Sequence, residues 1–218
     1  MTRAVVLDLD GTLVDSAPDI ARALTSALTA HELPGIDADR VRGLLGGGAA
    51  ELVRGTLDAV GGDPALAGPV LAAYSSAYRA EPAAATTVHA DAHEALQALR
   101  DRGIRIGVCT NKRTGLSHDV LAATGLAPLV DVVVGIDAVP AGKPDPGHLE
   151  AALTALDVSP ADALYVGDTG IDALTAQRAG VPYRHVSWGH PLPGVTTIDT
   201  FGALAEGLAD KEFHATEQ

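Results

Sequence analysis

Two carboxylates and a glycine follow a short apolar run near the start of the chain. Residues 4–7 are aliphatic, and the next residues are Asp8, Leu9, Asp10, Gly11 and Thr12. On an extended strand, the side chains at positions 8 and 10 share one face, where two like charges disfavour joint ionisation. A bound cation would resolve that conflict, but an ordinary turn after a strand also uses Asp and Gly. This segment alone leaves both a reaction centre and a plain turn open.

Other polar side chains lie at the ends of other predicted strands, which favours the reaction centre over the plain turn. They are Thr110, Asn111 and Lys112 after a strand at 104–110, Lys143 in a loop after a strand at 129–134, and Asp168 and Asp172 after a strand at 163–167. Ligand sites of open parallel sheets lie beyond the carboxyl ends of the strands. We therefore expect these side chains to meet Asp8 and Asp10 at one edge of the sheet, as a reaction centre.

Phosphoryl transfer is the chemistry that needs these residue types. Its transition state spreads negative charge over three oxygens, so the protein must supply cations, hydrogen-bond donors and an attacking oxygen held in line. A carboxylate is able to be that nucleophile, because an acyl phosphate divides one difficult displacement into two easier ones. Acidic ligands with room for water and a phosphate oxygen favour Mg²⁺ over Ca²⁺ or a metal that prefers soft ligands.

Four motifs in this order resemble the haloacid dehalogenase superfamily, in its phosphatase branch with a small helical cap. They are DLDGT at 8–12, Thr110-Asn111, Lys143 within GKPDP, and GDTGID at 167–172. The resemblance implies that Asp8 is the nucleophile and that Asp10 is the general acid and later the general base. It also implies that Thr110 and Lys143 bind the phosphoryl oxygens, with Asn111 and Gly11 beside them. The implied Mg²⁺ ligands are Asp8, the backbone carbonyl of Asp10, and Asp168, with Asp172 in direct contact or one layer behind.

The resemblance also narrows the reaction. Dehalogenases and phosphonate hydrolases of the superfamily lack the second aspartate, so Asp10 argues against both, whereas a sugar phosphomutase stays open. The segments 8–16, Gly46-Gly47-Gly48, 110–112 and Trp188-Gly189 are similar to phosphoglycolate phosphatases. Phosphatases for other small biosynthetic phosphoesters, or for pyrophosphate, share these features. The expected substrate is a small phosphomonoester, with 2-phosphoglycolate the best single choice.

The pattern of predicted elements places the motifs on an α/β fold. After residue 88, strands and helices alternate, which predicts right-handed crossovers and a doubly wound, Rossmann-like parallel sheet. Residues 16–82 show helical segments and no strand, which is typical of an inserted all-helical domain. We therefore predict a core domain of residues 1–15 and 83–218, and a helical cap domain of residues 16–82.

The expected element boundaries follow from apolar periodicity, glycine and proline. Ser16 is the expected N-cap of the first helix. The predicted strands are 4–7, 104–110, 129–134, 163–167 and 183–186. The predicted helices are 18–31, 37–45, 49–60, 64–79, 92–102, 113–124, 146–156, a helix ending at 179, and 200–208.

Composition limits the class of protein. The 218 residues include 47% hydrophobic and only 3% aromatic residues, with a formal net charge of −13. Few stacking platforms and no basic clusters argue against a nucleic-acid partner. A single cysteine, Cys109, excludes an intrachain disulfide, and the apolar runs are too short for a signal peptide or a membrane span. We expect a cytoplasmic protein that binds a small molecule and does not associate with a membrane. We expect it to be a monomer or a homodimer.

A few residues outside the motifs are candidates for reading the leaving group of the substrate. Arg42 and Arg54 are cations of the predicted cap, although surface arginine is the usual case. Lys112 and Arg113 either approach the expected substrate entrance or take no part in it. The glycines 46–48 precede a predicted helix, so their backbone amides either face an anion or form a flexible joint.

Overall fold

A six-stranded parallel sheet forms the centre of the molecule in the computed structural model, which describes residues 2–213. In spatial order its strands are β5 (Val132–Gly135), β4 (Arg105–Thr110), β1 (Ala4–Leu7), β6 (Ala163–Gly167), β7 (Tyr183–Val186) and β8 (Thr197–Ile198). All five pairings are parallel. The chain builds from β1 outwards to β5 and then returns to β6 on the other side of β1. The doubly wound α/β fold expected from the sequence is confirmed.

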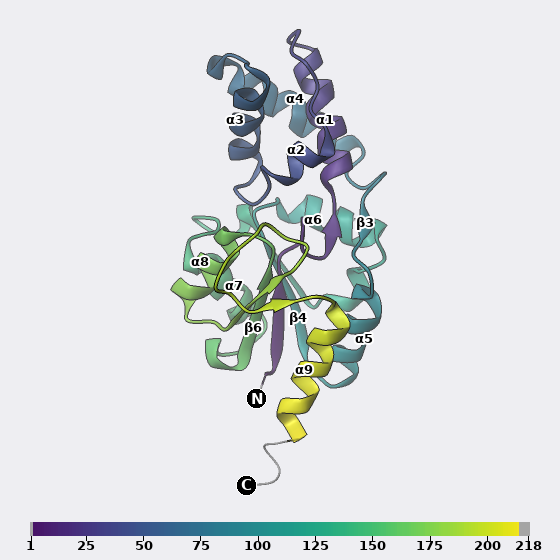
Figure 1. Ribbon diagram of the computed structural model, residues 1–218, viewed down its shortest axis with the longest axis vertical. Coiled ribbons are helices and arrows are strands. Elements are labelled where there is room, and N and C mark those ends of the chain that lie inside the picture. Colours follow the sequence, from purple (N-terminus) through teal and green to yellow (C-terminus); the bar gives the residue numbers. More distant parts are fainter. Residues whose placement is uncertain (1, 214–218) are drawn as a thin grey trace.

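Helices cover both faces of this sheet, as Figure 1 shows. They are α5 (Ala92–Asp101), α6 (Thr114–Ala123), α7 (Pro146–Ala155), α8 (Gly170–Ala179) and α9 (Phe201–Phe213). Along β1, Val5 and Leu7 pack into the apolar cluster with α5, α6 and α9, whereas Ala4 and Val6 pack with α7 and α8. This alternation explains why β1 is apolar at every position: both of its faces are buried.

Four helices from residues 17–80 pack together at one end of the molecule, at the top of Figure 1. They are α1 (Ala17–Thr29), α2 (Ala38–Arg42), α3 (Ala49–Val60) and α4 (Ala67–Ala80). Their buried residues form a cluster separate from the two that flank the sheet. Within residues 2–208, Leu116 of α6 is the one partly buried apolar residue from outside the segment that packs against this cluster. We call residues 17–80 the helical segment.

A short antiparallel ribbon lies where the chain enters and leaves the helical segment. Strand β2 (Val14–Asp15) pairs with β3 (Thr87–Val88), with Val14 opposite Val88. Two-residue strands carry no periodicity, so the sequence did not predict them, and the same is true of β8. The other differences concern boundaries. Helix α2 ends at Arg42 instead of residue 45, β5 begins at 132, and α9 extends to 213.

The register of the central strands decides which side chains meet. Leu7 of β1 lies opposite Val108 of β4 on one side and Val166 of β6 on the other. The residues that follow these three therefore emerge at the same edge of the sheet. Among residues 2–213, no helix is both long and apolar enough to span a bilayer.

Candidate active site

Asp8 begins the site, directly after the last residue of β1. Its backbone N–H donates to the Val166 carbonyl at 2.9 Å, which extends the pairing with β6 by one residue. Its side chain is 5% exposed, and its Oδ1 accepts the backbone N–H of Leu9 at 2.7 Å. Burial raises the pKa of Asp8 to about 6, and the nearby ammonium of Lys143 acts in the opposite direction. The Asp8 carboxylate is therefore fixed in place, and Lys143 offsets only part of the effect of burial on its pKa.

Lys143 supplies the cation at this edge. Its buried Nζ lies 2.9 Å from Asp8 Oδ2 and 2.6 Å from Asp172 Oδ1, and it donates to the hydroxyl of Tyr165 at 3.0 Å. Burial alone would lower its pKa, but the two carboxylates raise the pKa of Lys143 above its usual value. The loop that carries Lys143 is held in turn, because its backbone N–H donates to Asn111 Oδ1 and His148 Nδ1.

Asp168 enters from the end of β6 and faces Asp8. Its Oδ1 accepts the hydroxyl of Thr12 at 2.9 Å. Gly11 makes this approach possible: a Cβ built at its position would lie 2.2 Å from Asp168 Oδ2, and its φ of +85° is one that other residues rarely adopt. Its N–H donates to the Val14 carbonyl at 2.8 Å. Gly11 was predicted to bind phosphate. In the structure its backbone N–H is already bonded to Val14, and its lack of a side chain leaves space for Asp168.

Asp172 lies in the first turn of α8 and is fully buried. Its Oδ1 accepts from Lys143 and from the Tyr165 hydroxyl, and its Oδ2 accepts from the N–H and the hydroxyl of Thr169. With Thr169 it forms a reciprocal capping box at the start of α8. Burial acts to raise the pKa of Asp172, but Lys143 and these hydrogen bonds hold it below its ordinary value. Both oxygens already have partners, which makes Asp172 the anchor of Lys143.

These acidic groups together suit a metal ion. Asp8, Asp168 and Asp172 are all buried, and one ligand atom from each lies within 4.8 Å of the others. Burial, followed by the charges of Asp172 and Asp8, raises the pKa of Asp168 well above its usual value. Three buried carboxylates face the single ammonium of Lys143, so the cluster carries excess negative charge that a divalent cation would neutralise. Oxygen ligands of this kind suit a hard cation.

Thr110 and Asn111 follow β4 on the other side of Asp8. Thr110 is 2% exposed, and its hydroxyl accepts the backbone N–H of Lys112 at 3.2 Å, which leaves its proton free to donate. The Asn111 amide donates to the carbonyls of Gly46 and Lys143 at 2.8 and 3.0 Å. Both side-chain donors of Asn111 are thus used to tie the Lys143 loop to the helical segment, so any contact with phosphate would need its backbone N–H.

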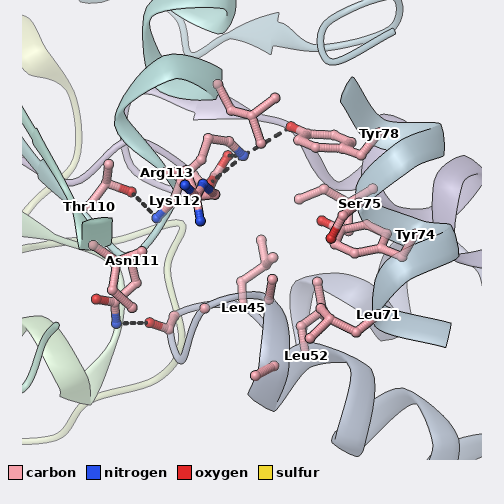
Figure 2. A pocket seen from close by; sticks show the side chains of 18 of the residues that line it. Leu45, Leu52, Leu71, Tyr74, Ser75, Tyr78, Thr110, Asn111, Lys112 and Arg113 are labelled. Atoms are coloured by element: carbon pink, nitrogen blue, oxygen red, sulfur yellow. Dashed lines mark hydrogen bonds and ion pairs between the residues drawn. The ribbon is translucent and has the colours of Figure 1, made fainter. Parts of the chain in front are cut away.

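Asp10 stands beside this group, at the floor of a cavity. Its two oxygens each lie 2.7 Å from Lys112 Nζ, and its Oδ1 also accepts the hydroxyl of Ser16 at 2.5 Å. The sequence predicted Ser16 as a helix N-cap; it occupies that position, but its hydroxyl makes no capping bond. Lys112 also donates to the hydroxyl of Tyr78 on α4 at 2.9 Å, as the dashed line in Figure 2 shows.

The cavity lies between the sheet edge and the helical segment and has a volume of about 340 Å³. Figure 2 shows its two walls: Thr110, Asn111, Lys112 and Arg113 come from the core, and Leu45, Leu52, Leu71, Tyr74, Ser75 and Tyr78 from the helical segment. Asp8 and Asp10 also line it. The core wall is polar and the opposite wall is largely apolar.

The two arginines of the helical segment that the sequence indicated as candidates do not reach this cavity, whereas Arg79 of α4 lines it. Arg42 pairs with Asp15 and Asp39, and Arg54 pairs with Glu51. Neither lines the cavity, which agrees with the plainer expectation of surface arginine. The glycines at 46 and 48 do line it, and the Gly46 carbonyl serves as the acceptor for Asn111. This contact between core and helical segment was not among the alternatives that the sequence suggested.

Several partners of the site residues were not predicted from the sequence. Thr12 and Thr169 lie inside the motifs and could have been noticed there. Tyr165 and Tyr78 lie inside a buried strand and an amphipathic helix, where an aromatic residue is usually a core residue. Only the packing of separate elements shows that their hydroxyls reach Lys143 and Lys112.

Comparison with known sequences gives a consistent set of relatives. The sequence profile described as a haloacid dehalogenase-like hydrolase matches residues 2–180. A phosphoglycolate phosphatase from Rhodospirillum rubrum is 40% identical over 221 residues, covering 95% of this chain and 91% of the relative. A phosphoglycolate phosphatase from Cereibacter sphaeroides is 39% identical over 198 residues, covering 87% of this chain and 89% of the relative.

Comparison with solved structures gives the same fold. The crystal structure of a predicted phosphoglycolate phosphatase from Haemophilus somnus superposes with a TM-score of 0.85 at 25% identity. The match covers 95% of this chain and 98% of that one, so it includes both the sheet and the helical segment.

Proposed function

The chain belongs to the haloacid dehalogenase-like hydrolases, and from this premise we propose that it is a Mg²⁺-dependent phosphatase acting through an aspartyl phosphate on Asp8. It is a phosphatase of the phosphoglycolate phosphatase-like group, with a small phosphoester as its substrate. The observation that carries the proposal is the grouping of Asp8, Lys143 and Asp168 at one sheet edge, beside a cavity that Asp8 and Asp10 line.

Mg²⁺ is the proposed metal because the ligands are carboxylate oxygens with no nitrogen or sulfur among them. Asp8, Asp168 and the backbone carbonyl of Asp10 would hold the ion. Asp172 contributes charge and holds Lys143, since its oxygens are already bonded. When bound, the ion neutralises negative charge on the phosphoryl oxygens.

In the first step, an oxygen of Asp8 attacks the phosphorus. The new bond joins Asp8 to phosphorus, and the bond from phosphorus to the leaving oxygen breaks with its electron pair on that oxygen. Lys143 and the Thr110 hydroxyl donate to the phosphoryl oxygens, where negative charge accumulates. Asp10 in its acid form gives its proton to the leaving oxygen, so that an alcohol departs instead of an alkoxide.

In the second step, Asp10 acts as the base. It takes a proton from a water molecule, whose oxygen attacks the phosphorus. The bond from phosphorus to Asp8 breaks, which releases inorganic phosphate and restores the Asp8 carboxylate. The proton that Asp10 gave in the first step returns in the second, so the residue ends as it began.

The helical segment would act as the cap that covers the reaction centre, as residues 16–82 were predicted to do. Its apolar wall faces the polar edge across the cavity and would exclude bulk water during the reaction. We propose 2-phosphoglycolate as the first substrate to test, because the curated relatives are phosphoglycolate phosphatases. We keep the cytoplasm as the proposed compartment, on the ground of the single cysteine.

The test is phosphate release by the purified protein. We expect release from 2-phosphoglycolate in the presence of Mg²⁺ and loss of release when EDTA removes the ion. The substrate panel should include a sugar phosphate and pyrophosphate. Isomerisation of a sugar phosphate without net phosphate release would identify a phosphomutase instead, and faster turnover of another ester or of pyrophosphate would replace 2-phosphoglycolate as the substrate.

A further inference from the structure

The carboxylate of Asp10 is held by side chains from two places in the chain. Lys112, in the loop after β4, donates to both oxygens at 2.7 Å. Ser16, the residue directly before the helical segment, donates to Oδ1. Lys112 and Asp10 are both nearly buried, with 6% and 16% of their side chains exposed. The orientation of Asp10 therefore depends on these donors.

Lys112 is itself held by helix α4. Its Nζ donates to the Tyr78 hydroxyl at 2.9 Å and lies 4.7 Å from the centre of the Tyr78 ring. Tyr78 is 1% exposed and stacks on Tyr74 of the same helix at 5.7 Å between ring centres. A lysine side chain is flexible, and a contact at its end restricts it. The position of the ammonium is thus set by the helical segment as well as by the core.

A lysine in a substrate cavity has two plausible uses: it binds an anionic group of the substrate, or it orients another residue. The number of its donors decides between them here. An ammonium has three N–H donors. All three have partners in the structure, namely the two oxygens of Asp10 and the hydroxyl of Tyr78. None is left for a substrate anion. Oδ1 of Asp10 accepts from both Lys112 and Ser16, whereas Oδ2 accepts from Lys112 and keeps capacity for a proton.

We propose that Lys112 is a positioning residue for Asp10, and that Tyr78 makes this positioning depend on contact between the helical segment and the core. Lys112 and Ser16 fix the Asp10 carboxylate so that Oδ2 is free for proton exchange with the leaving group. When the helical segment moves away, Lys112 loses its partner on α4 and Asp10 loses its fixed orientation. This inference rests on the proposed function, because it assigns a partner to the proposed acid and base.

The experiment compares Lys112→Met with the wild-type protein on three substrates. Ethyl phosphate has a poor leaving group and no second anion, 2-phosphoglycolate has a poor leaving group and a carboxylate, and p-nitrophenyl phosphate has a leaving group that needs no proton. The measured quantity is kcat/KM, which reports the steps up to formation of the aspartyl phosphate. General acid catalysis raises the rate by about 10²-fold or more when the leaving group must be protonated.

We expect Lys112→Met to lower kcat/KM by about 30-fold or more on both ethyl phosphate and 2-phosphoglycolate, and by less than about threefold on p-nitrophenyl phosphate. Lys112→Arg should recover part of the loss, because it restores a cation beside Asp10. The matched control is Arg113→Met, which removes a neighbouring cation of the same wall that makes no bond to Asp10. In that control the ratio between ethyl phosphate and p-nitrophenyl phosphate should not change.

Three results would overturn the inference. An equal loss on all three substrates would give Lys112 a merely structural part. A loss confined to 2-phosphoglycolate would show that Lys112 binds the substrate carboxylate. An unchanged kcat/KM on ethyl phosphate would show that Asp10 does not need Lys112. Failure of the proposed function looks different, because wild-type protein would then release phosphate from none of the three.

Tyr78→Phe tests the link to helix α4 and also serves if Lys112→Met does not fold. It removes one hydroxyl from Lys112 and keeps the ring and the ion pair with Asp10. We expect a loss of about two- to fivefold in kcat/KM on ethyl phosphate, again larger than on p-nitrophenyl phosphate. If Tyr78→Phe lowers kcat/KM by the same factor on both substrates, Tyr78 has no part in the proposal.

Discussion

The two walls of the cavity are built from different kinds of residue and teach different things. The core wall consists of polar side chains that follow the strands, and each is fixed by bonds to neighbouring elements, as Lys143 is by Asp172 and Tyr165. Leucine and tyrosine are the main residues of the wall from the helical segment, and the Tyr78 hydroxyl accepts a hydrogen bond from Lys112 of the core wall. In the proposed function, the chemistry belongs to the core, and the helical segment shapes and closes the space.

The largest expected effect comes from replacing Asp8, the proposed nucleophile of the core wall. Asp8→Asn keeps the shape of the side chain but cannot attack phosphorus, so phosphate release should fall by at least about 10³-fold. Asp39→Asn is the matched control, because that carboxylate lies exposed in the helical segment. Phosphate release by Asp8→Asn near the wild-type rate would refute the assignment of chemistry to the core.

The next largest effect is on stability and concerns Lys143. Lys143→Met leaves the buried carboxylates of Asp8 and Asp172 without their cation, which should lower the free energy of unfolding by about 3–5 kcal/mol in metal-free buffer. Urea unfolding followed by circular dichroism measures this. Adding Asp172→Asn to the same chain should recover part of the loss, whereas Arg54→Met, at an exposed pair, should change little.

Replacing Asp168 should stabilise the metal-free protein, whereas replacing Lys143 should destabilise it. The carboxylate of Asp168 is crowded against Asp8 and Asp172, so Asp168→Asn should raise the melting temperature in EDTA while abolishing the rise that Mg²⁺ gives to the wild-type protein. The Thr12 hydroxyl is still able to donate to the amide oxygen. A lower melting temperature in EDTA, together with a full response to Mg²⁺, would contradict the proposed metal site.

The pH dependence of the same cluster follows from the raised pKa values. Asp8 has a pKa of about 6 in the folded protein against the ordinary 3.8, so between these pH values the folded state binds more protons than the unfolded state. Its contribution to stability therefore decreases as pH rises from about 4 to 6. Asp168, whose pKa is also raised, acts in the same direction. In EDTA, the stability advantage of Asp168→Asn over wild type should grow with pH, and urea unfolding at several pH values measures it.

The smallest effects are expected on the apolar wall. Leu45→Ala enlarges the cavity without touching a reacting group, so it should change KM by less than about fivefold and leave kcat nearly unchanged. Leu33→Ala is the control, because Leu33 packs in the same apolar cluster but does not line the cavity. A loss of kcat in Leu45→Ala as large as in Asp8→Asn would contradict the assignment of the chemistry to the core wall alone.

The same contrast explains what could be predicted from the sequence. The core residues follow buried strands within short motifs, so parallel pairing was enough to predict that Asp8 and Asp168 would meet. Periodicity also predicted the helical segment. It could not predict how α4 packs against the core, and therefore not the contact between Tyr78 and Lys112. The two-residue strands β2 and β3 were missed because pairs of residues carry no pattern. The roles found for Gly11 and Asn111 depend on where their donors point, which spacing does not determine.

The central claim is that Asp8 carries the phosphoryl group during the reaction. The direct measurement uses Asp10→Asn, which should slow hydrolysis of the intermediate, with p-nitrophenyl phosphate as a substrate whose leaving group needs no proton. After acid quench and peptide mapping by mass spectrometry, the account predicts a phosphoryl group on Asp8. Nitrophenol release with no phosphorylated Asp8, or with the phosphoryl group on another residue, would contradict it.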